Sequence, residues 1–531
     1  MMSSSVHFLQ DQLVEHNFRS VVVLLFCLPL IYVAANELVR HKARIPSFNG
    51  PAGLPIIGNI ADIRVNAAEK YRQWAKKYGP VYQIQLGNIP VIVVNSAESA
   101  RVIFGQHSQA LSSRPVFYTN LQFHKVLSNT AGTTIGTSPF SDSLKRRRKG
   151  AASALNKPSV QTYLPHLDIE TLSFVREAFK YGSAGAKPID PMPLIQRLSL
   201  SLSLTLNWGI RMGDSENALF HEITHVEDEI SRFRSTTGNL QDYIPLLRLN
   251  PFSFGTRKAG EMRRRRDVYL KKLNKDLDDR MEKGTHKPCI QANVILDTEA
   301  RLNKEELTSI SLTMLSGGLD TITTLMQWAI ALLGQRPDIQ AKAITEIRKM
   351  YSDSAEEIFC DVHDDMKCEY VMALVKESLR YYTVLRLALP RATVRDITYK
   401  GNLIPAGTTI FLNAWSCNMD EMVWGADVEE FRPERWLERP DAPLFTYGMG
   451  YRMCAGSLLA NRELYLAFMR MLSCFEIVGK KGDVDVHPVR GSSDPTSLVT
   501  MPERYEVKFV PRNEKSLREV LERKEEEGLF E

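Results

Sequence analysis

The sequence lacks the features that define several common protein classes. Its seven cysteines are odd in number and include no CxxC pair, which excludes a secreted disulfide framework and indicates thiols in a reducing compartment. The formal net charge is only +5 over 531 residues, too small to indicate nucleic-acid binding. No flavin or nicotinamide fingerprint occurs, because the Gly-x-Gly that starts at Gly448 is too short and lacks a βαβ context. Electrons for any redox chemistry would therefore come from a separate protein.

Long apolar runs are also scarce, and the one that stands out covers residues 20–39. It is apolar apart from Asn36, Glu37 and the flanking Ser20. Twenty helical residues reach about 30 Å, which is enough to cross the hydrocarbon core of a bilayer. We therefore expect a transmembrane anchor here, with residues 1–19 on the lumenal side.

The charges that flank this run predict its orientation. Arg19 is the one firm positive charge close before it, whereas Arg40, Lys42 and Arg44 follow it, so the positive-inside rule places the bulk of the chain in the cytosol. The endoplasmic reticulum is the expected membrane. The alternative is a cleaved signal peptide, but the segment before the run carries acidic residues and lacks a basic n-region.

A glycine-rich stretch at residues 447–456 surrounds a single cysteine. Cys454 precedes a helical pattern at residues 457–471, so the helix dipole and nearby positive charge would favour its thiolate form. Arg452 supplies a fixed positive charge suited to a carboxylate. Three glycines allow backbone geometry and close approach that a Cβ would obstruct: Gly448, Gly450 and Gly456. The alternative is a buried structural cysteine in an ordinary turn.

This stretch resembles the haem-binding loop of the cytochrome P450 family. The resemblance implies that Cys454 is the axial ligand of the iron in haem b. Arg452 would contact a haem propionate, and the loop glycines would lie against the cofactor. The family's usual first residue is Phe, whereas this chain has Tyr447, which keeps the ring and adds a hydroxyl.

A second stretch of small residues lies inside a long helical pattern at residues 307–333. Gly317 and Gly318 would each cost about 1 kcal/mol relative to Ala in mid-helix, so their presence needs a reason. In the cytochrome P450 family a stretch of this kind passes close over the haem, and an acid–alcohol pair after it delivers protons during oxygen activation. Asp320 and Thr321 match that pair. The alternative is that the threonine hydroxyl only bonds the carbonyl four residues earlier.

Two further stretches resemble the charged motifs of the family. Glu377 and Arg380 lie three residues apart on one face of an expected helix at residues 370–382. Arg435 follows in the stretch Pro-Glu-Arg-Trp, whose Trp436 stands where Phe is commoner. The resemblance implies a buried ion network of Glu377, Arg380 and Arg435 that fixes the cysteine loop. Loss of one member would cost about 3–5 kcal/mol, because a buried charge would lose its partner.

Basic residues elsewhere give less specific signals. Arg148 and Arg391 match positions from which family members contact the haem propionates, although Leu144 replaces the usual Trp. The other basic residues within 145–149 would suit a surface that receives an acidic reductase. Residues 263–266 are consecutive arginines, which we expect to be exposed.

The resemblance implies a mainly α protein with small β-sheets, the cytochrome P450 fold, preceded by the transmembrane helix. Although length alone would suggest several domains, the motifs converge on one cofactor, so residues 60–512 form one expected domain. Residues 40–59, basic and rich in Pro and Gly, are the expected linker. Residues 513–531 are an expected charged, solvated tail.

Local patterns add expectations within that domain. A helix is expected at residues 71–78, and β-rich runs at residues 81–86 and 91–94 flank a turn. A hairpin is expected within residues 401–411, around Pro-Ala-Gly. Residues 241–252 are apolar and either dip into the membrane interface or simply pack against the domain.

The family implies a monooxygenase, which inserts one atom of O2 into its substrate and releases the other as water. Electrons would come from NADPH through a separate reductase, with cytochrome b5 as an optional second donor. A haem-thiolate isomerase or dehydratase is an alternative that would not need Asp320 and Thr321. A non-catalytic haem carrier is a further alternative, which would not need a pocket and a reductase surface together.

The substrate class is indicated by stretches such as residues 114–149, which resemble fungal phenylacetate hydroxylases and relatives that act on m-cresol and m-hydroxybenzyl alcohol. We expect hydroxylation of a small phenol, benzyl alcohol or aryl acid in fungal secondary metabolism, such as a polyketide mycotoxin pathway. The alternative is a phenylacetate-type hydroxylase of aromatic catabolism. His124 and Lys125 either pair with such a substrate or are exposed loop residues, and residues 493–501 are the family's last pocket segment.

Overall fold

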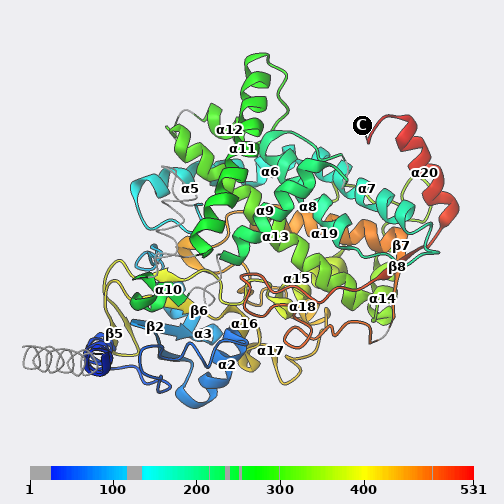
Figure 1. Ribbon diagram of the computed structural model, residues 1–531. Helices are drawn as coiled ribbons and strands as arrows, with labels where there is room; N and C mark the ends of the chain where they lie inside the picture. Colours follow the sequence, from blue (N-terminus) through cyan, green and yellow to red (C-terminus); the bar gives the residue numbers. More distant parts are fainter. Residues whose placement is uncertain are drawn as a thin grey trace, which may run out of the picture.

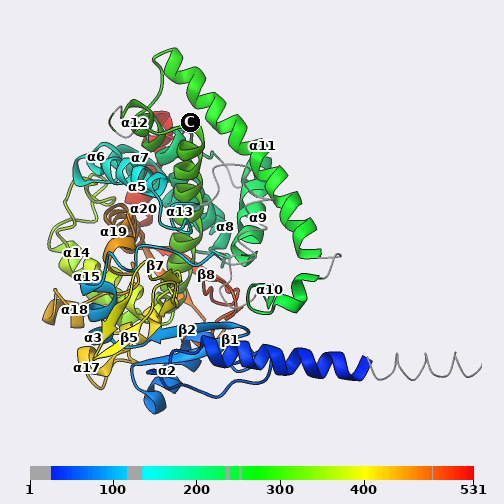
Figure 2. The ribbon, with the colours of Figure 1, turned by 90° about the vertical axis from the view of Figure 1, so that its left-hand side faces the viewer.

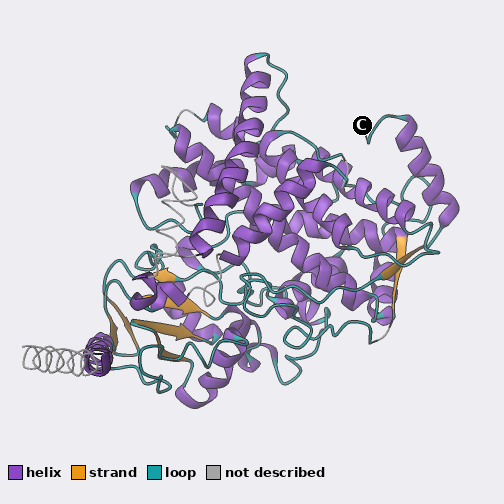
Figure 3. Ribbon diagram, viewed as in Figure 1, coloured by secondary structure: helices purple, strands orange, loops and turns teal. Residues whose placement is uncertain are grey.

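Helices dominate the described chain, and small sheets lie at two edges of the helical body (Figures 1 and 3). The computed structural model describes residues 25–116, 134–213, 216–233, 240–249, 254–297, 299, 301–480 and 482–530. The prediction of a mainly α architecture with small β-sheets is confirmed.

The helices expected at residues 71–78, 307–333, 370–382 and 457–471 are present, with slightly different ends. The α-helices are α2 (Ala67–Tyr78), α3 (Ala97–Ala100), α5 (Asp142–Ala154), α6 (Lys157–Thr162), α7 (Leu164–Tyr181), α8 (Met192–Trp208), α9 (Ala218–Phe233), α10 (Leu240–Tyr243), α11 (Phe254–Glu282), α12 (Ile290–Leu296), α13 (Lys304–Leu333), α14 (Pro337–Arg348), α15 (Glu369–Tyr382), α16 (Ala414–Asn418), α17 (Glu421–Trp424), α18 (Arg435–Glu438), α19 (Ser457–Cys474) and α20 (Glu514–Glu526). Shorter helical turns are η1 (Arg101–Gln106), η2 (Pro245–Leu249) and η3 (Gly450–Arg452). The long central helix α13 begins with a capping box, in which the Asn303 and Glu306 side chains each accept the other's backbone N–H.

The largest sheet has four strands in the order β1-β2-β6-β3. The strands β1 (Val81–Leu86) and β2 (Ile89–Val94) form the predicted antiparallel hairpin, and β6 (Thr409–Leu412) joins β2 in parallel. The two-stranded sheets pair β4 (Ile397–Tyr399) with β5 (Asn402–Ile404), and β7 (Phe475–Gly479) with β8 (Val507–Pro511). β3 (Arg391–Ala392) pairs with β6, so the sheet positions Arg391.

The prediction of a hairpin within residues 401–411 is wrong. β5 pairs with β4 across a turn at Lys400 and Gly401, whose φ angles are 48° and 82°. β6 belongs to the other sheet, where its four residues are buried between β2 and β3. Two adjacent residues with positive φ close a tight hairpin, whereas Pro405 and the residues after it connect two sheets.

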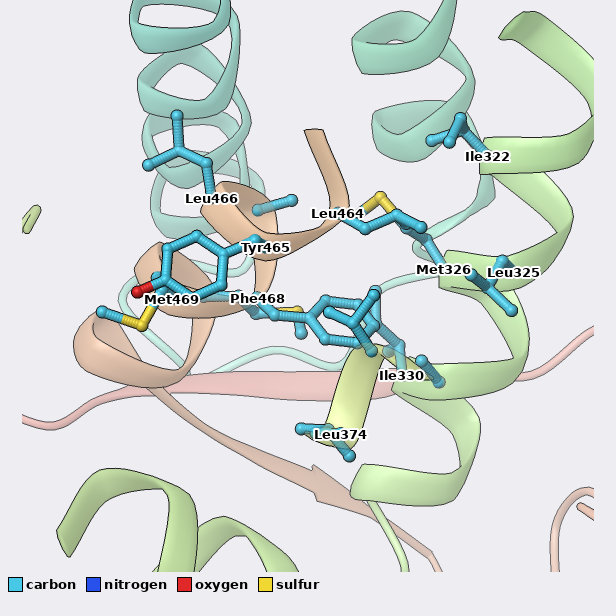
Figure 4. Packing of buried hydrophobic residues seen from close by; sticks show 14 of the residues in the cluster. Ile322, Leu325, Met326, Ile330, Leu374, Leu464, Tyr465, Leu466, Phe468 and Met469 are labelled. Atoms are coloured by element: carbon cyan, nitrogen blue, oxygen red, sulfur yellow. The ribbon is translucent and has the colours of Figure 1, made fainter. Parts of the chain in front are cut away.

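The main core joins α13, α15 and α19, because their apolar faces pack against one another. Figure 4 shows the side chains of this cluster: Ile322, Leu325, Met326 and Ile330 from α13, Leu374 from α15, and Leu464, Tyr465, Leu466, Phe468 and Met469 from α19. Most of these side chains are almost fully buried. The core therefore holds α19, which follows Cys454, in a fixed position against the part of α13 that directly follows its small-residue stretch.

The amino-terminal helix lies beside the β1–β2 hairpin (Figure 2). Residues 25–43 are helical, and residues 20–24 of the expected anchor lie outside the described residues. Within the described part of the chain, no helix combines the length and the apolar character needed to cross a bilayer.

The carboxyl-terminal tail differs from the expected solvated segment. It forms α20, whose residues Leu517, Val520 and Leu521 are buried in the main core. Their spacing puts them on one helical face, which explains how a highly charged segment still packs. Arg518 of the same helix lies over the ring of Phe179 on α7, with 5.1 Å from its guanidinium carbon to the ring centroid.

Candidate active site

The cysteine loop is a tight turn before α19. The backbone N–H of Cys454 donates to the carbonyl of Tyr447 at 2.9 Å, which closes the loop. Gly448 and Gly450 have φ angles of 69° and 68°, a region that favours glycine. A Cβ on Gly450 would also lie 2.2 Å from the carbonyl oxygen of Phe104, so a side chain there would push η1 and the loop apart.

The thiol of Cys454 is accessible, yet burial raises its pKa above the usual value. Both observations fit a sulfur that faces a recess enclosed by protein. The backbone N–H of Gly456 and the charge of Arg148 lower the pKa, but desolvation is the larger effect. Desolvation therefore opposes the thiolate form that the helix end and the nearby charge favour. A metal ion bound to the sulfur would displace the proton.

The hydroxyl of Tyr447, which departs from the usual family residue, bonds to α19. It donates to the side-chain oxygen of Asn461 on α19 at 2.7 Å. The extra hydroxyl therefore ties the start of the loop to α19 and leaves the sulfur's hydrogen bonding to the backbone.

A cluster of arginines lies next to the loop: Arg114, Arg148, Arg391 and Arg452. Burial and the neighbouring arginines lower the pKa of Arg391 to about 9 and that of Arg452 to about 10. The same two causes lower the pKa of Arg114 well below its usual value. Among the described residues, no carboxylate forms an ion pair with any of the four. Clustered cations without a counter-charge indicate a site for an anionic group.

The arginines are held in place by backbone carbonyls. Arg452 donates to the carbonyls of Ser112 and Ser138 at 2.8 and 2.9 Å, and to that of Ile135 at 2.7 Å. Arg391 donates through Nη2 to the carbonyl of Met449 at 2.6 Å, while its buried Nη1 has no hydrogen-bond partner among the described residues. An unpartnered buried N–H is costly, so this donor is suited to a bound acceptor.

Arg114 is a member of the cluster that the sequence does not predict. It donates through Nε to the carbonyl of Gly136 at 2.8 Å and through Nη1 to that of Pro390 at 2.8 Å. Its burial at 7% exposure beside Arg391 marks it as part of the same cluster. A lone arginine before a proline carries no sequence signal of its own, because only the fold brings residues 114 and 391 together.

The acid–alcohol pair lies on α13. Thr321 donates its hydroxyl to the carbonyl of Gly317 at 2.7 Å. This is the bond to the carbonyl four residues earlier that the sequence leaves open as an alternative role for the threonine. Gly317 is exposed, and a Cβ built on it would meet no atom within 4 Å, so this face of the helix borders open space. Gly318 is different, since a Cβ there would lie 2.6 Å from the hydroxyl oxygen of Ser203 on α8.

Glu377, Arg380 and Arg435 form one fully buried ion network. Arg380 bonds both carboxylate oxygens of Glu377 at 2.8 Å, and Arg435 bonds Oε1 at 3.1 Å. Trp436 donates its indole N–H to Oε2 at 3.0 Å, and the backbone N–H of Arg432 donates to Oε1 at 2.9 Å. The carboxylate is therefore fully satisfied, and Trp436 contributes a donor that the commoner Phe would lack.

The network reaches the cysteine loop through one asparagine. Arg380 donates to the carbonyl of Asn418 at 3.1 Å, and the side chain of Asn418 accepts the N–H of Phe445 at 2.9 Å. Its amide also donates to the hydroxyl of Thr446 at 3.1 Å, and Thr446 donates in turn to the carbonyl of Leu379 at 2.6 Å. These bonds fix the two residues before Tyr447.

Comparison with known proteins decides the family. The chain matches the family "Cytochrome P450" over residues 48–509. It is 67% identical over 520 residues, 98% of this chain and 99% of the relative, to a 3-hydroxyphenylacetate 6-hydroxylase of Emericella nidulans. It is 43% identical over 506 residues, 92% of this chain and 96% of the relative, to a phenylacetate 2-hydroxylase of the same organism. A cytochrome P450 monooxygenase of Mycosarcoma maydis is 38% identical over 517 residues, 95% and 94% of the two chains.

The chain belongs to the cytochrome P450 family. It is a monooxygenase, as its motifs predict, and the family implies haem. The described residues of this P450 fit that cofactor, because an accessible thiol, an unpartnered buried guanidinium N–H and a cluster of uncompensated arginines adjoin one loop. A haem carries two carboxylates that such arginines would neutralise.

Other basic residues of this P450 differ from expectation. Arg147 is buried and donates to the hydroxyl of Ser309 at 2.6 Å, so it is no part of the expected basic surface, whereas Arg146 stays exposed although it pairs with Glu306 at 2.6 Å. Arg266, expected to be exposed with its neighbours, is only 4% exposed. His124 and Lys125 lie outside the described residues.

Proposed function

We propose that this P450 hydroxylates the ring of an aryl acid, with 3-hydroxyphenylacetate as substrate and ring carbon 6 as the position attacked. The identity of 67% over almost the full length of a 3-hydroxyphenylacetate 6-hydroxylase carries this proposal. That similarity favours the aryl-acid alternative of aromatic catabolism over a polyketide mycotoxin pathway. Carbon 6 is para to the phenolic hydroxyl, where the ring is most electron-rich for attack by an electrophilic oxidant.

We assign roles to the residues of this chain. Cys454 would bind the haem iron through its sulfur, with the loop glycines and Tyr447 shaping the space beside it. Arg114, Arg148, Arg391 and Arg452 would hold the propionates. Haem with a thiolate ligand supplies the activation of O2.

The pair Asp320 and Thr321 would hold and pass protons to the site. Thr321 already uses its proton in a bond to Gly317, so it would have to rotate its hydroxyl to act as a donor. Glu377, Arg380 and Arg435 would keep the cysteine loop rigid through Asn418.

The family supports a proposal for the electron supply and the location of this chain. We propose that a separate NADPH-dependent reductase, with cytochrome b5 as an optional donor, supplies electrons to this chain. We place the protein at the endoplasmic reticulum membrane, with its catalytic domain in the cytosol. The apolar run at residues 20–39 supports this, as do Leu246, Leu247 and Leu249 around η2, which are exposed despite being apolar.

The experiment combines binding and product analysis on the purified, haem-loaded chain. With reductase and NADPH, 3-hydroxyphenylacetate should give a haem spin-state change and a product hydroxylated at carbon 6. Two matched compounds separate the required groups, since phenylacetate lacks the hydroxyl and m-cresol lacks the carboxylate. Turnover of m-cresol alone would refute the aryl-acid assignment, and binding only of large lipids or steroids would refute the substrate class.

A Cys454→Ala variant tests the ligand. After reduction and addition of carbon monoxide it should lose the absorbance band near 450 nm that gives the family its name. A band of wild-type position and size would disprove the assignment of Cys454.

A further inference from the structure

A buried polar cluster ties the helix pair α9–α11 to α13. Glu227 of α9 is 1% exposed, and Arg266 of α11 forms an ion pair with it at 3.0 Å. Tyr269 of α11 donates to Glu227 Oε1 at 2.7 Å. Ser316 of α13 donates to Oε2 of the same carboxylate at 2.7 Å and accepts from Arg266 at 3.1 Å. One carboxylate therefore joins three helices.

The charges in this cluster are stable where they lie. Burial lowers the pKa of Arg266, but Glu227 and then Tyr269 more than offset this and raise the pKa overall, so the guanidinium stays charged beside the carboxylate that it pairs with at 3.0 Å. A hydroxyl bonded to an ionised carboxylate forms one of the stronger hydrogen bonds of a protein interior. The bond from Ser316 is therefore a firm attachment point on α13.

This attachment lies next to the paired glycines of α13. Ser316 directly precedes Gly317 and Gly318, which loosen a helix because they offer no side chain for packing. The carbonyl of Gly317 accepts the hydroxyl of Thr321, so the position of this turn sets the position of the threonine. On its other side the turn is confined by α8, at the close approach between Gly318 and Ser203.

We propose that Glu227 is a positioning residue, which acts through Ser316 to hold the α13 turn that carries Asp320 and Thr321. It thereby links the placement of the α9–α11 pair to the proton-delivering residues. The proposal rests on the proposed function for the roles of Asp320 and Thr321. The attachment itself depends only on the contacts of the cluster.

The test replaces Ser316 by alanine in the full-length, haem-loaded chain. Ser316→Ala removes one bond to Glu227 and leaves the pair of Glu227 with Arg266 intact. Amide hydrogen exchange over residues 317–321 should become about tenfold faster, because this turn loses its attachment. Product formed per NADPH consumed should fall several-fold, with the 450 nm carbon monoxide band retained.

Ser311→Ala is the matched control. Ser311 is also buried on α13, but its hydroxyl donates to the carbonyl of Leu307 in its own helix at 3.3 Å. Its exchange and coupling should match the wild type. Equal effects of the two alanine variants, or no effect of Ser316→Ala, would overturn the proposal.

Ser316→Thr keeps a hydroxyl and should restore slow exchange and efficient coupling. If it behaves as Ser316→Ala does, the proposal is also overturned. The exchange measurement needs no substrate, so it stays decisive if the wild type hydroxylates no aryl acid. A wild type that hydroxylates no aryl acid would refute the proposed function but not the role of Glu227.

Discussion

Two ionisable side chains of this P450 are buried where an isolated charge would be unstable. Arg391 is 3% exposed and keeps one N–H without a partner among the described residues. Glu463 is a second case, a carboxyl group in α19 at 8% exposure. At Arg391 a bound anion would satisfy the donor, whereas at Glu463 a proton removes the charge.

Replacing Arg391 by leucine should weaken haem binding. A charge-assisted hydrogen bond contributes about 1.5–3 kcal/mol, which corresponds to a roughly tenfold to hundredfold weaker affinity. The rate of haem transfer to apomyoglobin measures this loss, and the 450 nm band of the remaining haem-loaded protein should not move. Arg395→Leu, at an exposed position four residues on, is the control and should transfer haem at the wild-type rate. Equal rates for both variants would contradict the role of Arg391.

Glu463 should make stability depend on pH. Burial raises its pKa from 4.5 to about 8, and no basic side chain of the described residues pairs with it. Because the folded protein holds the proton more tightly than the unfolded chain, stability is lost as pH rises from about 5 to about 8. The difference between the two pKa values corresponds to on the order of 5 kcal/mol. Glu463→Gln should therefore gain stability over the wild type above pH 8 and match it near pH 5, in urea unfolding series. A gain that does not change with pH would argue against this origin.

At the scale of elements, contacts near in sequence were predictable and contacts between distant segments were not. The apolar periodicity of α13 and α15 is enough to predict both helices, because a helix depends on residues that are close together in sequence. Arg266 was expected to be exposed as one of a run of arginines, but Glu227, 39 residues earlier, gives it a buried partner. β6 was assigned to the wrong partner for the same reason, since its neighbour β2 lies more than 300 residues away in sequence.

Some residues of the candidate site could be predicted from the sequence, and others could not. Cys454, Asp320 and Glu377 were identified because the resemblance to a known family assigns roles that no local property shows. Arg114 opens a stretch that resembles the family, but nothing in that stretch assigns it a role, and only the fold brings it beside Arg452. The donor role of Trp436 could not be predicted, because it depends on where α18 places the ring against α15.

Trp436→Phe should destabilise the protein although Phe is the commoner residue of the family. The change removes one donor from the buried carboxylate of Glu377 and should lower the free energy of unfolding by about 1–3 kcal/mol. Urea unfolding of the haem-loaded chain measures it. Trp74→Phe, at a half-buried position whose indole N–H has no hydrogen bond among the described residues, is the control. An unchanged or increased stability of Trp436→Phe would show that the indole bond contributes nothing.

At the scale of the whole molecule, the amino-terminal helix is joined to the catalytic domain by polar contacts. Asn36 and Glu37, the polar exceptions in the apolar run, face this junction. Asn88 of the β1–β2 turn donates to Asn36 at 2.7 Å, and the N–H of Ile56 donates to Glu37 at 2.9 Å. The backbone N–H of Asn88 also donates to the carbonyl of Tyr243 in α10 at 2.9 Å. One turn of the sheet therefore contacts both the amino-terminal helix and the segment that precedes the exposed leucines of η2.

Breaking this junction should expose the chain to protease. Glu37 pairs with Arg40 at 2.5 Å, and Arg40 is 6% exposed because it also donates to the carbonyl of Leu54 at 3.0 Å. In the purified full-length protein, Glu37→Ala should free Arg40 and speed tryptic cleavage after it by about tenfold, since local opening governs cleavage in a folded chain. Glu98→Ala removes an exposed carboxylate of α3 and should leave the rate unchanged. Cleavage of Glu37→Ala at the wild-type rate would mean that the helix is held by its apolar face alone, and the polar residues would then have no part in orienting the domain.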